Sequence, residues 1–349
     1  MQSVENEMLK KQIVIWLMVV IFMIVAMVFV GGLTRMTGSG LSMVHWRPVT
    51  GILPPLTEEV WEKEFKGYQS SPEYQQVNLG MSLDDFKTIY YWEYSHRVLG
   101  RLVGLVFLLP MLYFWVRGGL NSWLRNRLIW AFILGGAQGV LGWYMVKSGL
   151  VDVPHVSHFR LAAHLSLALF LICYLLWILW SVAGISRFRG ESNLRRPIQC
   201  LFIVVLWQIV YGAFTAGLHA GLVYNTFPTM NGLWIPPGLV SFNPEWVNFV
   251  SNPVTVQLLH RIGGVLTMLG SLLVCVSVFR SRRGVMLRGW ALVLVATVFM
   301  QVVLGVSALL LRVPISLGSA HQMGACLVLV VCLFLLYKTS GFDRRAKSA

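Results

Sequence analysis

The amino-acid sequence predicts an all-α membrane protein with eight transmembrane helices, arranged as two tandem, parallel four-helix bundles. Three observations lead to this prediction. The chain is 56% hydrophobic and only 12% charged, whereas a soluble domain carries about a quarter charged residues. Apolar stretches of about 20 residues, the length needed to cross a bilayer, recur along the chain. The two halves of the chain also resemble each other.

The apolar stretches are expected to be helices, because a backbone in hydrocarbon must satisfy its hydrogen bonds internally. No small-residue cleavage site follows the first stretch, so we expect a retained span rather than a signal peptide. The eight stretches cover residues 13–33, 90–116, 126–146, 160–185, 198–217, 254–279, 286–311 and 318–337.

The distribution of Lys and Arg predicts that both termini are cytoplasmic, because cytoplasmic segments are enriched in these residues. The outer connection 218–253 contains none of them. This asymmetry explains the net charge of +14, and no nucleic-acid-binding motif accompanies it. The inner segments hold 17 of the 28 basic residues: Lys10, Lys11, Arg117, Arg125, Arg127, Arg187, Arg189, Arg195, Arg196, Arg280, Arg282, Arg283, Arg288, Lys338, Arg344, Arg345 and Lys347.

A repeat relates the two halves, which we place at residues 1–185 and 198–349. The offset, which is the number of residues between two matched positions, falls steadily along the chain. This is expected for a tandem duplication in which the first half has longer outer loops. Each half has an even number of spans, so the repeats are parallel. The matched residues are Gly31 with Gly212, Thr34 with Thr215, His96-Arg97 with His260-Arg261, Gln138 with Gln301, Gly142 with Gly305, and Ala163-His164 with Ala320-His321.

Four histidines, His96, His164, His260 and His321, lie within predicted spans at similar depths, two in each half. A single intramembrane histidine can be a helix–helix hydrogen bonder. Four at matched depth that also follow the repeat favour a role as ligands. Two imidazoles without Cys or Asp fall short of a structural zinc site, and copper more often brings Cys or Met. Each pair suits the two axial positions of a haem iron.

Cationic residues near the same boundary are candidate partners for haem propionates, namely Arg35, Arg97, Arg160 and Arg261. For any one of them, snorkelling to the membrane interface is the alternative. We expect Gly100, Gly263 and Gly264 to leave room beside the ligands for a flat macrocycle, although small residues are also common where helices meet.

The repeat breaks at Glu93, whose counterpart is Gln257. Glu93 lies one turn before His96 on the same helix face. An acid in one half only suggests that this half performs chemistry, as a general base or by stabilising a developing cation. The alternative is an i,i+4 ion pair between Glu93 and Arg97.

Several segments together resemble the haem A synthase family, in the long-first-loop branch of proteobacterial and mitochondrial members. They cover nearly the whole chain and are EYSHRVLGR (93–101), RLAAH (160–164), NTFPTMNGLWIPP (225–237), HRIGG (260–264), AHQMGA (320–325) and GILPPLTEEVWEKEF (51–65). Some family members carry a cysteine pair in the first outer loop, and residues 34–89 here contain no cysteine.

The resemblance implies oxidation of a methyl group of haem O to the formyl group of haem A in the bacterial inner membrane. It implies that His96 and His164 face the substrate haem in the N-terminal half, that His260 and His321 ligate a permanent haem b in the C-terminal half, and that Glu93 is the catalytic acid. Haem O synthase and an unidentified electron partner are implied partners, and a homo-oligomer is left open.

The main alternative is a bis-histidine dihaem membrane cytochrome that only transfers electrons. Both predicted haems would lie near the outer face. Electron transfer across the membrane would need a further haem near the inner face, which argues against this alternative. The sequence assigns no role to His45, His155, His158 or His219, and the five cysteines fall in predicted spans, where packing is expected.

Overall fold

The computed structural model describes residues 2–45, 51, 53–151, 153–187 and 192–341. Within these ranges the regular structure is helical, apart from one isolated β-bridge between Met230 and Leu233. Eight of the helices are long and apolar enough to cross a membrane, so the predicted all-α class with eight spans is confirmed. The predicted basic residues Arg189, Arg344, Arg345 and Lys347 lie outside the described ranges.

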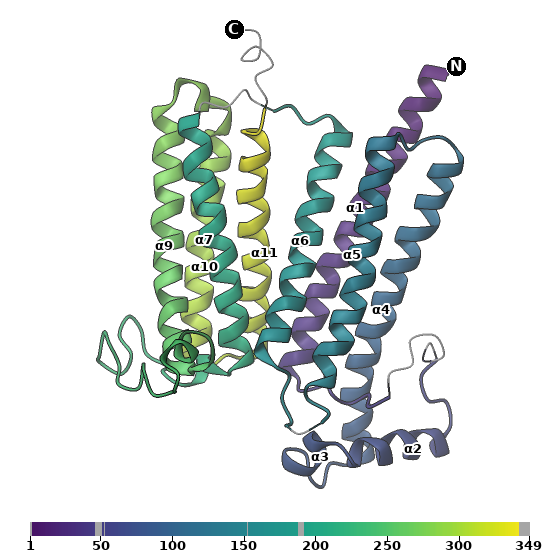
Figure 1. Ribbon diagram of the computed structural model, residues 1–349, viewed down its shortest axis with the longest axis vertical. Coiled ribbons are helices and arrows are strands. Elements are labelled where there is room, and N and C mark those ends of the chain that lie inside the picture. Colours follow the sequence, from purple (N-terminus) through teal and green to yellow (C-terminus); the bar gives the residue numbers. More distant parts are fainter. Residues whose placement is uncertain (1, 46–50, 52, 152, 188–191, 342–349) are drawn as a thin grey trace. The chain divides into compact units, whose positions relative to one another are not determined.

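The chain divides into two compact units, an N-terminal unit (Met1–Gly184) and a C-terminal unit (Ile185–Ala349), each with four of the spans (Figure 1). The spans of the N-terminal unit are α1 (Gln2–Met36), α4 (Leu83–Val116), α5 (Ser122–Lys147) and α6 (His158–Ala183). Those of the C-terminal unit are α7 (Ser192–Gly217), α9 (Pro253–Arg280), α10 (Arg288–Leu310) and α11 (Ile315–Lys338).

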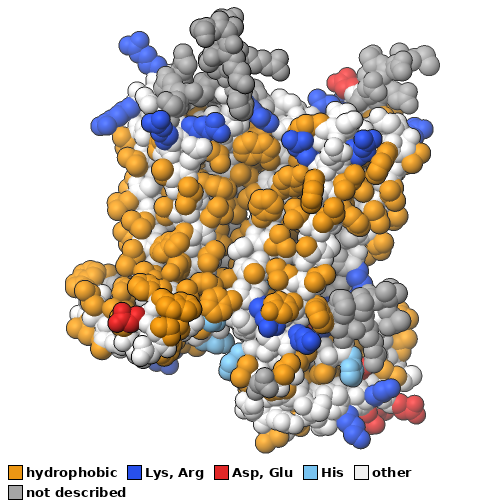
Figure 2. Space-filling model, in the orientation of Figure 1, with side chains coloured by type: hydrophobic (Ala, Val, Ile, Leu, Met, Phe, Trp, Pro, Cys, Tyr) orange, Lys and Arg blue, Asp and Glu red, His pale blue; other side chains and the backbone are white. Residues whose placement is uncertain are grey.

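The spans form a closed ring of contacts in each unit. In the N-terminal unit α1 and α5 each pack against both α4 and α6. In the C-terminal unit α7 and α10 each pack against both α9 and α11. The order of neighbours along the chain is therefore the same in the two units. Figure 2 shows apolar side chains covering the flanks of the helices in each unit, as expected for surfaces that face lipid. The chain is a multi-pass membrane protein.

Helix α4 begins at Leu83, earlier than the apolar stretch that starts at residue 90. Its N-cap is Ser82, whose hydroxyl accepts a hydrogen bond from the Asp85 backbone N–H at 3.2 Å. Asp84 and Asp85 occupy the first turn, where acidic side chains stabilise the positive end of the helix dipole. Apolar length marks where the chain crosses the membrane, whereas the capping residues set where the helix begins.

The connection between α1 and α4 contains α2 (Glu58–Gln69) and α3 (Pro72–Gln76). Thr57 is the N-cap residue of α2, and its side chain makes no capping hydrogen bond. An aromatic core joins α2 to the start of α4. The Trp61 and Tyr90 rings lie 5.0 Å apart between centroids, and the Tyr68 and Phe86 rings 5.1 Å apart. The connection is therefore an ordered module attached to the helix that carries His96.

The connections of the C-terminal unit contain short elements. Between α7 and α9 these are η1 (Ala220–Leu222), η2 (Glu245–Val247) and α8 (Asn248–Ser251), and η3 (Arg282–Leu287) precedes α10.

Candidate functional site

Each of the four span histidines packs against a glycine of the neighbouring helix. A Cβ added to Gly31 would lie 3.0 Å from the His96 ring, and one added to Gly142 would lie 3.0 Å from the His164 ring. In the C-terminal unit the same test places a Gly212 Cβ 3.2 Å from His260 and a Gly305 Cβ 2.7 Å from His321. The Gly305 distance lies below 3.0 Å, where real Cβ atoms are essentially never found, and the other three distances are tighter than most real Cβ contacts. These glycines therefore leave the space that the imidazoles occupy.

Glutamine side chains fasten three of these histidine segments to the adjacent helix. Gln138 donates to the His164 carbonyl and Gln301 to the His321 carbonyl, both at 2.8 Å. Gln208 donates to the His260 carbonyl at 2.9 Å. The equivalent position in the N-terminal unit is Met27, so the repeat gave no signal for this third contact.

The ring separation of the C-terminal pair fits a metal between the two imidazoles. The His260 and His321 centroids lie 6.3 Å apart, with the ring planes at 85°. Two imidazoles on opposite sides of one metal, each with a metal–nitrogen distance of about 2 Å, would have centroids roughly 6 Å apart. In the N-terminal unit, His96 and His164 lie within electrostatic range of each other.

The donor set favours a metal that brings most of its own ligands. Among the described residues, no group of three or more His, Cys, Asp and Glu side chains gathers. The Nδ1 atoms of His164, His260 and His321 are buried without a hydrogen-bond partner in the described structure. Because an unsatisfied buried polar atom is costly, these rings are suited to a bound group. A porphyrin supplies four ligands to its iron and leaves two axial positions, which the two histidines of each unit could fill.

Glu93 lies at the centre of a hydrogen-bonded anchor between α4 and the segment that follows α1. Its carboxyl group is buried, with 3% of the residue exposed. One oxygen accepts from the Ser42 hydroxyl and from the Met43 backbone N–H, both at 2.8 Å. The other accepts from the Nε and Nη2 atoms of Arg97 at 3.1 and 2.5 Å. The ion pair considered as the alternative role of Glu93 is therefore present.

Arg97 completes this anchor, which we call the Glu93 anchor (Ser42, Met43, Glu93 and Arg97). Its guanidinium also donates to the Met43 carbonyl at 3.0 Å and to the His45 carbonyl at 3.3 Å. The carboxylate and the guanidinium together hold the outer segment over the helix that carries His96.

A matching anchor exists in the C-terminal unit, where the neutral amide of Gln257 takes the place of the Glu93 carboxylate. Arg261 donates to the Tyr224 carbonyl at 2.9 Å, and Gln257 donates to the same carbonyl at 2.9 Å. The repeat offset that aligns Gly31 with Gly212 also aligns Met43 with Tyr224. The matched residues Met43 and Tyr224 are therefore both held through their backbone, Met43 by the Glu93 carboxylate and Tyr224 by the Gln257 amide.

The remaining predicted residues lie in different surroundings. Arg160 donates to the Tyr144 carbonyl at 2.7 Å, and its guanidinium lies 3.6 Å from the centroid of the Tyr144 ring. Arg35 occupies the last turn of α1. A Cβ on Gly263 would lie 2.0 Å from Gln208, so the expectation that Gly263 leaves room for a macrocycle was wrong. This glycine allows α9 to pack closely on α7.

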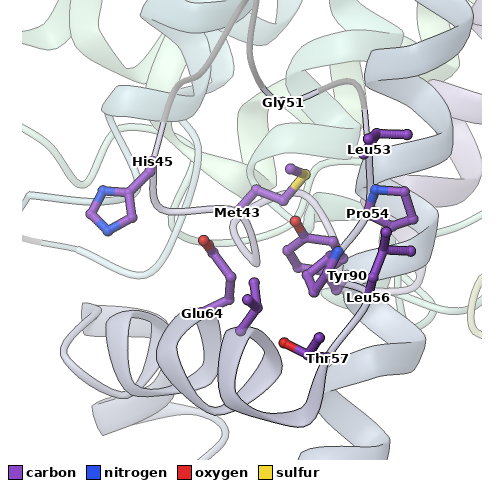
Figure 3. A pocket seen from close by; sticks show the side chains of 11 residues that line it. Met43, His45, Gly51, Leu53, Pro54, Leu56, Thr57, Glu64 and Tyr90 are labelled. Carbon is purple, nitrogen blue, oxygen red and sulfur yellow. The ribbon is translucent and has the colours of Figure 1, made fainter.

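A cavity of about 250 Å³ lies beside the Glu93 anchor, in the connection between α1 and α4. Met43, Tyr90, Pro54 and Leu56 line it together with the acidic Glu64 (Figure 3). Figure 3 shows the His45 ring directed away from the other labelled side chains. This cavity is mainly apolar and is lined by none of the four span histidines.

Sequence reasoning did not identify Ser42 and Met43, because both lie in a turn far along the chain from Glu93. The four glycines carried a usable signal. They occupy matched positions in the repeat. A glycine at the same place in both units is expected where each unit needs a side chain to pack closely on the neighbouring helix.

Comparison with known proteins gives one consistent result. A family model described as cytochrome oxidase assembly protein matches residues 14–333. A protein of Parvibaculum lavamentivorans named Heme A synthase is 45% identical over 327 residues, which is 93% of each chain. Proteins with the same name are 44% identical over 335 residues in Nitrosospira multiformis (93% of each chain) and 43% identical over 331 residues in Rhizobium meliloti (92% of this chain, 88% of that protein). With this full-length similarity, the chain belongs to the cytochrome oxidase assembly protein family.

Proposed function

We propose that the protein is a haem A synthase, which oxidises a methyl group of haem O to the formyl group of haem A. The observation that carries this proposal is similarity to proteins named Heme A synthase over 93% of the chain. The two histidine pairs are consistent with it. A dihaem cytochrome that only transfers electrons is the second candidate, and the comparisons do not favour it.

The two units are best explained as tandem, parallel four-helix bundles. The same order of helix contacts in each unit supports this, and so do the matched glycine–histidine contacts. Bundles of four helices commonly hold cofactors between facing helices. We place the protein in the bacterial inner membrane with both termini cytoplasmic, because the basic residues are concentrated in the segments on that side.

The two histidine pairs take different roles. We assign His96 and His164 to the substrate haem O, and His260 and His321 to a permanent haem b. When bound, haem b would supply one-electron transfer to and from the substrate site. The ring separation of His260 and His321 supports the second assignment. Haem O synthase would supply the substrate, an electron partner would accept the electrons, and a homo-oligomer is compatible with these roles.

Among the four arginines predicted to contact propionates, Arg261 is the best supported. Its Nε atom is buried without a partner in the described part of the chain. Arg97 uses its Nε and Nη2 atoms within the Glu93 anchor and its Nη1 atom at the His45 carbonyl, so we assign it first to holding that anchor. Arg35 and Arg160 stay predictions.

Glu93 is the proposed catalytic residue of the N-terminal unit. Its carboxylate already accepts hydrogen bonds on both oxygens, so proton abstraction would require one of these bonds to break. Stabilising positive charge that develops on the substrate requires no such change. We therefore favour the electrostatic role over the general base.

The test uses Glu93→Gln, which reproduces the neutral side chain of Gln257. The amide can donate to the Met43 carbonyl as Gln257 does to Tyr224, so the outer segment should stay attached. We expect haem A formation in cells supplied with haem O to fall about 100-fold or more, with the protein folded and haem b retained. Gln257→Ala is the matched control and should retain activity. Full activity of Glu93→Gln would show that Glu93 only anchors the segment.

A further inference from the structure

The connection between α7 and α9 exposes large apolar side chains at the end of the C-terminal unit near its histidines. Trp234 is 71% exposed and Trp246 is 66% exposed. Phe249, Phe242, Ile235 and Val240 are exposed as well. We call residues 226–252 the apolar loop. Exposed apolar surface of this kind marks an interaction site.

The apolar loop is folded and does not present these side chains on a free segment. Asn248, only 1% exposed, accepts from the Ser241 and Phe242 backbone N–H groups at 3.0 Å each and donates to two carbonyls. Asn252 donates to the Gly238 carbonyl at 2.7 Å. These bonds hold the backbone while the aromatic side chains face outward.

The loop is continuous with the membrane-facing flank of the unit. It lies in the connection between α7 and α9 and ends directly before Pro253, the first residue of α9. The Tyr211 hydroxyl of α7 donates to the Phe249 carbonyl at 3.3 Å. Ile262, Val265 and Leu266 on α9 are exposed near the same end. Figure 1 shows the loop extending sideways past the end of α9, and Figure 2 shows apolar side chains over this region.

The charge of the loop matches an interface between lipid and water. Residues 226–252 contain Glu245 and no Lys, Arg or Asp. The corresponding connection of the N-terminal unit differs, because it carries acids at Glu58, Glu59, Glu62 and Glu64. Trp is enriched at membrane interfaces, and an element that lies in the interface buries its apolar face at the headgroup boundary.

We propose that the apolar loop is an interfacial anchor, with Trp234, Ile235 and Trp246 inserted at the headgroup–acyl boundary of the membrane. The anchor holds a segment that Arg261 also contacts, at the Tyr224, Pro228 and Thr229 carbonyls. Lipid contact would therefore hold this segment from outside, and Arg261, the chain neighbour of His260, holds it through these carbonyls.

The test places spin labels at two pairs of matched positions. The full chain, with its five native cysteines replaced, is reconstituted as single copies in nanodiscs of phosphatidylcholine and phosphatidylglycerol. Ile235→Cys is compared with Leu79→Cys in the acidic connection, because these positions are 75% and 77% exposed. Val240→Cys and Val77→Cys, at 66% and 61%, form a second pair in case one variant folds poorly.

Power saturation then measures the collision of each label with oxygen, which partitions into lipid, and with a water-soluble nickel chelate. We expect labels at 235 and 240 to collide more with oxygen than with nickel, and labels at 79 and 77 to show the reverse. If labels at 235 and 240 meet the nickel chelate as readily as those at 79 and 77, the loop faces water and the proposal is overturned. That result would indicate that the apolar surface binds a protein partner instead of lipid.

Discussion

Gly305 and Gly289 lie on the same helix, α10, and differ in what a side chain would meet. A Cβ on Gly305 would lie 2.7 Å from the His321 ring, whereas one on Gly289 has no atom within 4 Å. We expect Gly305→Ala to displace His321 and to weaken haem retention about tenfold or more. Gly289→Ala should leave haem content unchanged and can stabilise the helix by about 0.5–1 kcal/mol. Haem absorbance per purified protein measures both, and equal absorbance in the two variants would contradict the ligand assignment of His321.

Ser42 holds one oxygen of Glu93 and is expected to act as a positioning residue. A hydrogen bond to a charged group contributes roughly 1.5–3 kcal/mol. We therefore expect Ser42→Ala to lower the rate of haem A formation by about 10- to 100-fold, with haem content unchanged. Ser42→Thr keeps the hydroxyl and should restore much of the rate.

The control for Ser42 is Ser39→Ala, which removes a buried hydroxyl from the same turn. The Ser39 hydroxyl bonds to the Thr37 hydroxyl, and no hydrogen bond joins it to Glu93 in the described structure. If Ser42→Ala and Ser39→Ala form haem A at the same rate, Ser42 does not position Glu93.

The module formed by α2, α3 and the start of α4 contains a buried acid, Glu73. Burial raises the pKa of Glu73 to about 7, although the hydrogen bond from Tyr68 acts in the opposite direction. Because the folded-state pKa is raised, the folded module prefers the protonated form. The protonated Glu73 side chain therefore contributes its full stabilisation of the folded module below about pH 4.5, and this stabilisation is lost as the pH rises through about 7.

We accordingly expect local stability of this module to fall between about pH 5 and pH 8, by up to roughly 3 kcal/mol. Hydrogen exchange of the α2 and α3 amides measures the change, after correction for the intrinsic pH dependence of exchange. Glu73→Gln should remove the dependence. A pH dependence that persists in Glu73→Gln would assign it to another group.

At the scale of elements, the sequence predicted the spans well because apolar length is a direct requirement of the bilayer. It did not predict where α4 begins, since Ser82 and the acids after it extend the helix into the polar connection. It also missed the contact between Ser42 and Glu93, which depends on how a turn after α1 folds back onto α4.

At the scale of the whole molecule, the repeat was the most informative sequence feature. It identified the four histidines and the difference between Glu93 and Gln257. The structure shows that both side chains contact the backbone of matched residues, Glu93 at the Met43 N–H and Gln257 at the Tyr224 carbonyl. The repeat could not show which side chains the matched glycines face, because periodicity gives helix positions but not the rotation of one helix against another.

If the two pairs have separate roles, substitutions in the two units should have different effects. We expect His260→Ala to remove the haem b spectrum of the purified protein, because one axial ligand is lost. His96→Ala should retain that spectrum and lose haem A formation. An unchanged spectrum in His260→Ala would contradict the assignment of haem b to the C-terminal unit.

Conversion of haem O to haem A is the activity that we propose for this chain. The most direct measurement is mass analysis of extracted haems after the chain is expressed in cells without their own haem A synthase, with and without a supply of haem O. We predict haem A, heavier than haem O by the replacement of two hydrogens with one oxygen, only when both the chain and haem O are present. Haem O that persists unconverted beside a folded, haem b-loaded protein would contradict the claim and favour the electron-transfer cytochrome.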